Sequence, residues 1–195
     1  MTRPGSGKGP PGIVVGSLIA IMFGAVFIVV NSAGLPDPWA FVVRSAGLLV
    51  SMLLLAGLAR VTREAPLAAR APVSGFTDRR FWIIVTLEAV ALFGGLAIIN
   101  GVLHRPVVSV AWVALVVGLH FFGLGRIWRT LLYYALGTAM VLLGLAGFLI
   151  DALGGNAAEV DLVAGVGSGT AMFTAIGVAF RDALRGRTPR SGRRS

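Results

Sequence analysis

Long apolar runs separated by short polar segments dominate the chain. Six of these runs have about the 20 mostly apolar residues that a helix needs to cross a hydrocarbon core. They occupy residues 13–30, 39–59, 81–103, 107–124, 130–150 and 160–180. Backbone groups inside lipid can bond only to one another, so each run is predicted to be a helix. The expected fold is therefore all-α, a transmembrane bundle of six helices.

The breaks between the runs carry residues typical of helix starts. Asp37 is expected at an N-cap position, with Pro38 as the first helical residue. Pro106 is expected to act as Pro38 does, and Thr77 or Asp78 to cap the third helix. The six helices are interpreted as three consecutive hairpins.

The first helix of each hairpin contains a similar stretch. These stretches are "FGAVFIVVN" at 23–31, "FGGLAIIN" at 93–100 and "LGLAGFLID" at 143–151. Duplication of one hairpin explains the likeness. Chance similarity among glycine-rich apolar segments explains it equally well, so both interpretations stay open.

The composition places the chain among membrane proteins. Its 195 residues are 56% hydrophobic and 13% charged, whereas a soluble domain has about 25% charged residues. The absence of cysteine excludes disulfides, thiolate metal sites and thiol catalysis. Abundant Arg, Ala, Gly and Val are typical of a GC-rich bacterial genome, so the expected location is the bacterial cytoplasmic (inner) membrane.

The basic residues predict the orientation. Of the 17 Lys and Arg residues, all except Arg44 and Arg105 fall on one side of the predicted helices, which is the cytoplasmic side by the positive-inside rule. Both termini are thus expected in the cytoplasm, as disordered tails at 1–12 and 181–195.

This distribution of charge also bears on the partners. The basic residues are spread over the cytoplasmic connections and tails, as membrane topology requires, and do not form one binding face. No nucleic acid is therefore expected as a partner. The Arg-rich C-terminal tail is expected to contact anionic lipid head groups. One alternative stays open for the first run: "NSA" before Gly34 is typical of a signal-peptide cleavage site.

Small residues recur at four-residue spacing in two runs, where they let helix backbones approach closely in lipid. The predicted packing positions are Gly16, Ala20 and Gly24 in the first run and Gly165 and Gly169 in the last. The stretch "GVGSGT" at 165–170 has some likeness to a phosphate-binding loop. It lacks the required Lys and lies inside an apolar run, so no nucleotide or other cofactor is expected.

Glu88 and His120 are ionisable residues inside the predicted helices, where such residues are costly and need a partner. Glu88 follows Arg80 by about 12 Å of helix, and His120 precedes Arg126 by about 9 Å, at 1.5 Å per residue. Their helices are expected to be antiparallel neighbours, so the two side chains are predicted to meet. The pair has two interpretations, a proton or ion relay or a polar clasp between two helices.

Arg44 is the third ionisable residue inside a predicted helix, near the outer end of the second run. It is expected either to extend to the interface or to pair with Asp37 or Asp151. Three further polar residues, Asn31, Asn100 and His104, lie near the same end. They are interpreted as lining a vestibule or as bonding helix ends. No group of residues has metal-ligand spacing.

The segment "VGLHFFGLGRIWR" and the flanking third to fifth runs resemble an uncharacterised family of small bacterial polytopic membrane proteins, which carries a Gly-x-His-Phe segment. The matching residues are Gly118, His120, Phe121 and Arg126. Gly123 and Gly125 stand where the family has Pro and Ala. The resemblance implies a multi-pass membrane protein but brings no activity with it.

These observations favour a non-enzymatic accessory or assembly partner in the membrane. The alternative is a small-solute or proton-coupled transporter or channel that uses Glu88 and His120. An enzyme is not expected, because no nucleophile and base occur at usable spacing. Besides the bilayer, the expected partner is a second copy of the chain or another membrane protein.

Overall fold

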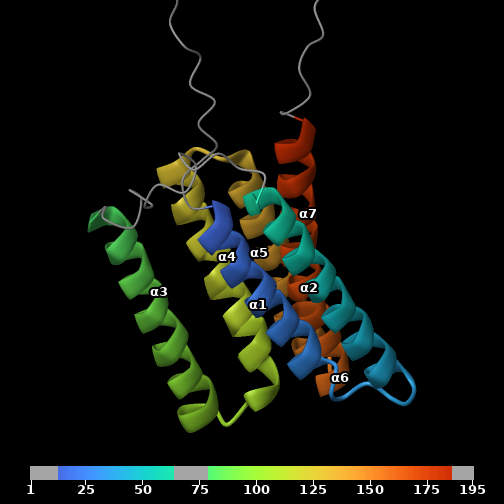
Figure 1. Ribbon diagram of the computed structural model, residues 1–195. Helices are drawn as coiled ribbons and strands as arrows, with labels where there is room; N and C mark the ends of the chain where they lie inside the picture. Colours follow the sequence, from blue (N-terminus) through green and yellow to red (C-terminus); the bar gives the residue numbers. More distant parts are fainter. Residues whose placement is uncertain (1–12, 64–78, 186–195) are drawn as a thin grey trace, which may run out of the picture.

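The computed structural model describes residues 13–63 and 79–185, and within these ranges it contains helices but no strand (Figure 1). The α-helices are α1 (Ile13–Asn31), α2 (Trp39–Arg63), α3 (Arg79–Ala97), α4 (Ser109–Trp128), α5 (Leu131–Ala152), α6 (Ala157–Val160) and α7 (Gly167–Arg185). The π-helical segment η3 (Ile98–Val102) continues α3, and η5 (Asp161–Val166) joins α6 to α7. A 3-10 turn, η4 (Pro106–Val108), precedes α4. The predicted all-α class is confirmed.

Five helical stretches are long and apolar enough to span a membrane. They are Trp39–Arg63, Arg79–Val102, Pro106–Trp128, Leu131–Ala152 and Ala157–Leu184. The apolar helix Val15–Asn31 is shorter. Each of the six predicted runs therefore coincides with one apolar helical stretch, because a continuous apolar sequence has no competing local structure available to it.

Several predicted boundaries need correction. Helix α2 continues to Arg63 and α7 to Arg185, so the first residues of the predicted C-terminal tail are helical. Pro38 is not the first helical residue: its carbonyl accepts a hydrogen bond from the Val42 N–H at 3.1 Å, and α2 begins at Trp39. Pro106 does begin the turn that precedes α4. Thr77, Asp78, the tail at 1–12 and the tail beyond Arg185 lie outside the described residues.

The helices pack in an order that differs from their order in the chain. The most extensive contact joins α4 to α5, and α7 then packs against both α5 and α1. Helix α2 lies against α1 and α7, whereas α3 stands at the edge of the bundle beside α4 (Figure 1). The α3 helix proper contains no buried residue. The bundle thus has a tightly packed interior and one peripheral helix.

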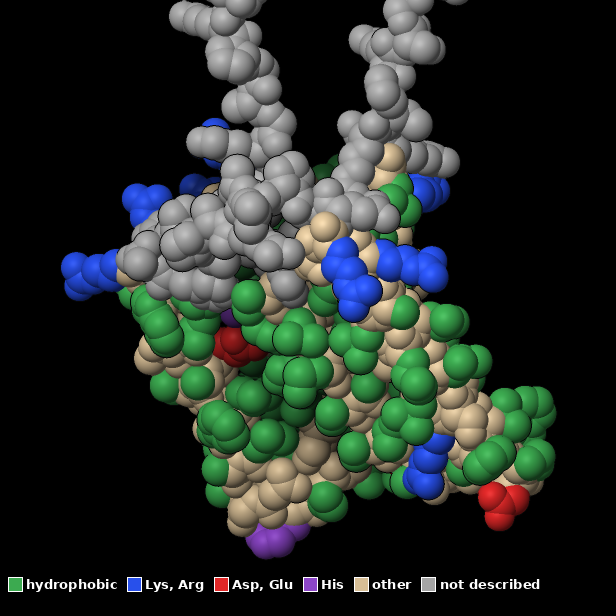
Figure 2. Space-filling model, in the orientation of Figure 1, with side chains coloured by type: hydrophobic (Ala, Val, Ile, Leu, Met, Phe, Trp, Pro, Cys, Tyr) green, Lys and Arg blue, Asp and Glu red, His purple; other side chains and the backbone are tan. Residues whose placement is uncertain are grey.

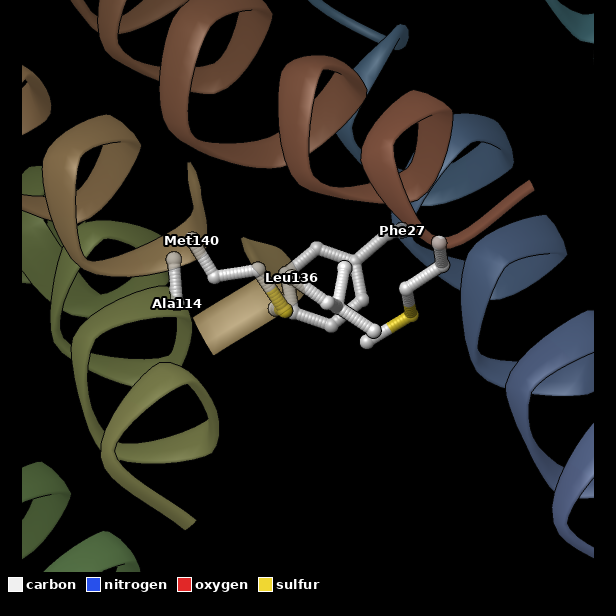
Figure 3. Close-up of a cluster of buried hydrophobic side chains, with 5 residues drawn as sticks. Phe27, Ala114, Leu136 and Met140 are labelled. Carbon is white, nitrogen blue, oxygen red and sulfur yellow. The ribbon is translucent and has the colours of Figure 1, made fainter. Parts of the chain in front are cut away.

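The main buried cluster lies where four of these helices meet. It contains Phe27 from α1, Ala114 from α4, Leu136 and Met140 from α5, and Met172 from α7 (Figure 3). Met140 and Ala114 are completely buried. A buried aromatic ring and two flexible methionines fill the irregular space between helices that cross at different angles. This cluster fixes α4, the helix that packs against α3, to the rest of the bundle.

Basic side chains gather at one end of the bundle, which we call the arginine-rich end. The described residues there are Arg60, Arg63, Arg79, Arg80, Arg126, Arg129 and Arg181. In Figure 2 most of the blue side chains lie at this end, above a surface made mainly of hydrophobic side chains. The helix ends that carry them lie together in Figure 1. The opposite end holds Asp37, His104, Arg105, Asp151 and Glu159.

Candidate functional site

Glu88 of α3 and His120 of α4 are in contact. The carboxylate Oε2 lies 2.9 Å from the imidazole Nδ1, and 13% of the His120 side chain and 22% of the Glu88 side chain are exposed. Both residues lie within the helical stretches that are long enough to span a membrane. The structure therefore places the predicted pair together, between the peripheral helix and the packed interior.

The spacing of residues along α3 explains this placement. The residues of α3 that touch α4 recur every three or four positions, which keeps them on one face of a helix. Ile84 lies against Gly123, and the Trp112 ring lies against Gly95. The Trp112 indole N–H donates to the Ala91 carbonyl at 3.2 Å. Glu88 falls on the same face, between Ile84 and Ala91, so its side chain is directed toward α4.

The contact between Glu88 and His120 is close but poorly aligned. Nδ1 of His120 is buried, and within the described residues it forms no hydrogen bond of acceptable angle, despite the short distance to Oε2. The oxygen therefore lies away from the direction in which the ring N–H points. The Phe121 ring packs edge-on against the imidazole, with 5.9 Å between ring centroids. The two side chains are therefore in close contact without a well-aligned hydrogen bond between them.

Arg44 does not pair with either of its predicted partners. Its Nε donates to the Ser32 hydroxyl at 3.2 Å. Asp151 instead forms an ion pair with Arg105, whose Nη2 lies 3.1 Å from Oδ2. The Arg105–Asp151 pair was not predicted, because Arg105 belongs to the connection between α3 and α4 and only the close packing of α4 on α5 brings Asp151 near it. Asp37 is exposed.

The polar residues near the same end bond to their own helices or to the adjacent turn. Asn31 donates to the Phe27 carbonyl at 2.7 Å, and His104 Nδ1 lies 3.0 Å from the Val102 carbonyl oxygen. Asn100 donates to the Leu96 carbonyl and also exchanges hydrogen bonds with Ser109, at 3.1 and 3.2 Å. These contacts match the interpretation in which the residues bond helix ends and do not line a vestibule.

Of the five small residues predicted to pack helices, four lie against another part of the bundle and Gly16 does not. Gly24 and Gly169 face each other across α1 and α7: an added Cβ on Gly169 would lie 2.6 Å from the Gly24 carbonyl oxygen. Gly165 lies against the side chain of Asn31, and Ala20 packs at the edge of a cluster formed by Ile21, Leu58 and Ile176. Gly16 has no such neighbour, since the nearest atom to an added Cβ is 3.9 Å away.

The close approach of α4 and α5 was not predicted. An added Cβ on Gly118 of α4 would lie 2.8 Å from the backbone nitrogen of Val141 and 3.0 Å from the Gly137 carbonyl oxygen of α5. An added Cβ on Gly144 would lie 2.8 Å from the Ala111 carbonyl oxygen. The signal in the sequence is a seven-residue spacing, with Gly118 and Gly125 on α4 and Gly137 and Gly144 on α5. A search at four-residue spacing misses it.

Two surface hollows are present, and neither is lined by Glu88, His120 or Arg44. One, of about 290 Å³, lies on α3 and is lined by Arg79, Trp82, Ile83, Thr86 and Leu87. The other, of about 400 Å³, lies between α2 and the η5–α7 stretch. Within residues 13–63 and 79–185, no three His, Asp or Glu side chains are grouped so that they could hold a metal ion. Glu88 and His120 thus form a partly exposed contact between two helices.

Comparison of the chain with family models, with curated proteins and with solved structures gave no match.

Proposed function

We propose that this chain is a six-span protein of the bacterial cytoplasmic membrane that acts as a non-enzymatic accessory or assembly partner. The observation that carries this proposal is the contact between Glu88 and His120. The two ionisable side chains lie against one another between α3 and α4, with 2.9 Å between Oε2 of Glu88 and Nδ1 of His120. A transporter is expected to place such residues along a wet pathway near the middle of the membrane, whereas a protein whose role is to assemble with others needs only that its helices hold together.

The packing of the interior supports the same reading. The main cluster is apolar, and its members Ala114 and Met140 are completely buried. Neither Glu88 nor His120 lines either of the hollows described above. The described members of the main cluster are all apolar and so offer none of the polar groups that a proton or solute needs to cross the bundle. The remaining candidate, a proton-coupled transporter, retains one argument in its favour, namely a carboxylate and an imidazole inside helices of spanning length.

The proposed topology has three helical hairpins and both termini in the cytoplasm. The gathering of basic side chains at the arginine-rich end supports it (Figure 2), because cytoplasmic loops carry the excess of Lys and Arg. The contacts of α1 with α2, of α3 with α4 and of α5 with α7 support the hairpins. The span assigned to α1 completes an even number of crossings.

Labelling of single cysteines tests the topology, and the cysteine-free chain needs no background substitutions. A membrane-impermeant thiol reagent added to intact cells is expected to label Gly34→Cys and Asn156→Cys. It is expected to label Arg129→Cys only after the membrane is opened. Labelling of Arg129→Cys in intact cells would overturn the proposed orientation.

Reconstitution tests the function. Vesicles that contain the full chain, placed in a pH gradient with a permeant counterion, are expected to lose the gradient no faster than protein-free vesicles. The matched variant is Glu88→Gln, which removes the carboxylate charge with little change in size. A flux that the wild-type chain supports and Glu88→Gln abolishes would replace the accessory role with a proton pathway.

A further inference from the structure

A groove of about 400 Å³ lies between α2 and the η5–α7 stretch. On the α2 side it runs from Val43 to Val50, and on the other side from Val166 to Thr174. At 1.5 Å per helical residue, each wall is roughly 10 to 12 Å long. Ile28 of α1 also contributes to the lining. The groove therefore follows the helix axes in the half of the bundle opposite the arginine-rich end.

The lining of this groove suits hydrocarbon and not a polar solute. Its polar side chains are Thr170 and Thr174. Their hydroxyls donate to the Val166 and Thr170 carbonyls, each at 2.8 Å, so their donor protons are already bonded within the helix. No charged residue lines the groove. A ligand inside it would meet apolar surface along both walls.

Arg44 follows a residue of the groove lining directly in the chain, and most of its hydrogen-bond donors have no partner among the described residues. Arg44 directly follows Val43, and its partner Ser32 lies one helical turn beyond Ile28, so both are adjacent to residues of the lining. The Arg44–Ser32 bond joins a charged donor to a neutral acceptor at 3.2 Å, and Ser32 is completely buried. Within the described residues Arg44 forms no ion pair. A guanidinium has five N–H donors, and the bond to Ser32 uses one of them.

From these observations we infer that Arg44 and the groove form a binding site for one phospholipid molecule. The phosphate accepts hydrogen bonds from Arg44, and one acyl chain lies in the groove between α2 and α7. A planar guanidinium matches a phosphate in charge and in geometry, which supplies the missing counter-charge. An acyl chain in the groove gains van der Waals contact with both walls, which is what drives apolar association within a bilayer. This inference rests on the proposed membrane location but not on the proposed orientation or role.

Native mass spectrometry of the full chain in detergent tests the site, with dioleoyl phosphatidylglycerol as the probe. Wild type is expected to retain one lipid more tightly than any further lipid. Arg44→Gln is expected to weaken that first binding about tenfold, the effect of losing one charged hydrogen bond. Arg44→Lys, which keeps the charge, is expected to retain most of it. Arg44→Gln should still fold, since Ser32 also donates to the Val29 carbonyl at 3.2 Å.

The groove has its own matched pair of variants. Ala46 lines the groove, while its exposed neighbour Ser45 does not. Ala46→Phe is expected to fill the groove and abolish the tight binding, and Ser45→Phe to leave it unchanged. Inorganic phosphate is not expected to compete, because it lacks the chain. Equal binding by wild type, Arg44→Gln and Ala46→Phe would overturn the site, whatever labelling and flux measurements show about topology and role.

Discussion

Helix α4 has α5 on one side and α3 on the other, and the two contacts use different chemistry. Toward α5, Gly118 and Gly144 bring backbones together, and an added Cβ would lie 2.8 Å from a backbone atom at either position. Toward α3, the contact is made by side chains: Trp112 donates to the Ala91 carbonyl, and His120 meets Glu88. Helices α4 and α5 are therefore held together by van der Waals packing of their backbones, whereas side-chain polar contacts attach the peripheral helix α3 to α4.

The largest expected effect comes from a methyl group in the α4–α5 contact. Gly118→Ala is expected to lower the free energy of unfolding by about 2 kcal/mol, because backbone atoms of α5 occupy the space and cannot rotate away. The measurement is the midpoint of denaturation in detergent. Gly94→Ala on α3 is the control: nothing lies within 4 Å of its added Cβ, and helix propensity favours Ala by about 1 kcal/mol. Equal losses in both variants would contradict the comparison.

A double-mutant cycle on Glu88 and His120 is expected to give the next largest effect. Glu88→Gln and His120→Gln should each cost about 1 to 2 kcal/mol, and the double mutant less than their sum, since each single change leaves the other group without its partner. The exposed pair Arg181 and Asp182 is the control, because its side chains are 62% and 65% exposed. Its coupling is expected to be under about 0.5 kcal/mol. Additive effects at Glu88 and His120 would rule out a clasp.

The smallest effect is expected from the indole of Trp112. Trp112→Phe keeps an aromatic ring against Gly95 but removes the donor to the Ala91 carbonyl. The loss of one neutral hydrogen bond is expected to cost about 1 kcal/mol or less. Trp39→Phe, at a side chain that is 60% exposed, should leave stability unchanged. A larger loss in Trp39→Phe than in Trp112→Phe would show that the contact of α3 with α4 contributes nothing.

The hydrophobic pattern was enough to predict the helices, because apolar runs of this length leave one local structure available. Their ends were less predictable: α7 continues through Arg181 to Arg185, since a change to polar residues does not itself end a helix. Matched depth along neighbouring helices predicted the contact of Glu88 with His120. The same reasoning was wrong for Arg44 and Asp151, because depth gives no information about which helices are neighbours when they are distant in the chain.

The close contact between α4 and α5 was missed for a related reason. Gly118 and Gly137 approach each other only because α4 ends abruptly at Arg129, which adopts a left-handed conformation with φ 51°. Nothing in the residue type predicts that conformation, since arginine has no special preference for it. The turn sets the register of the two helices, and the register decides which glycines meet.

The order of Glu88 and His120 along the chain has a consequence for biosynthesis. The ribosome delivers α3 to the translocon before α4, so Glu88 arrives ahead of His120, the residue that it contacts in the folded chain. A carboxylate near the centre of a nascent helix disfavours its release into lipid by about 2.5 kcal/mol or more. We therefore expect α3 to stay at the translocon until α4 is made, so that the two helices leave together and the contact between them forms at the point of insertion.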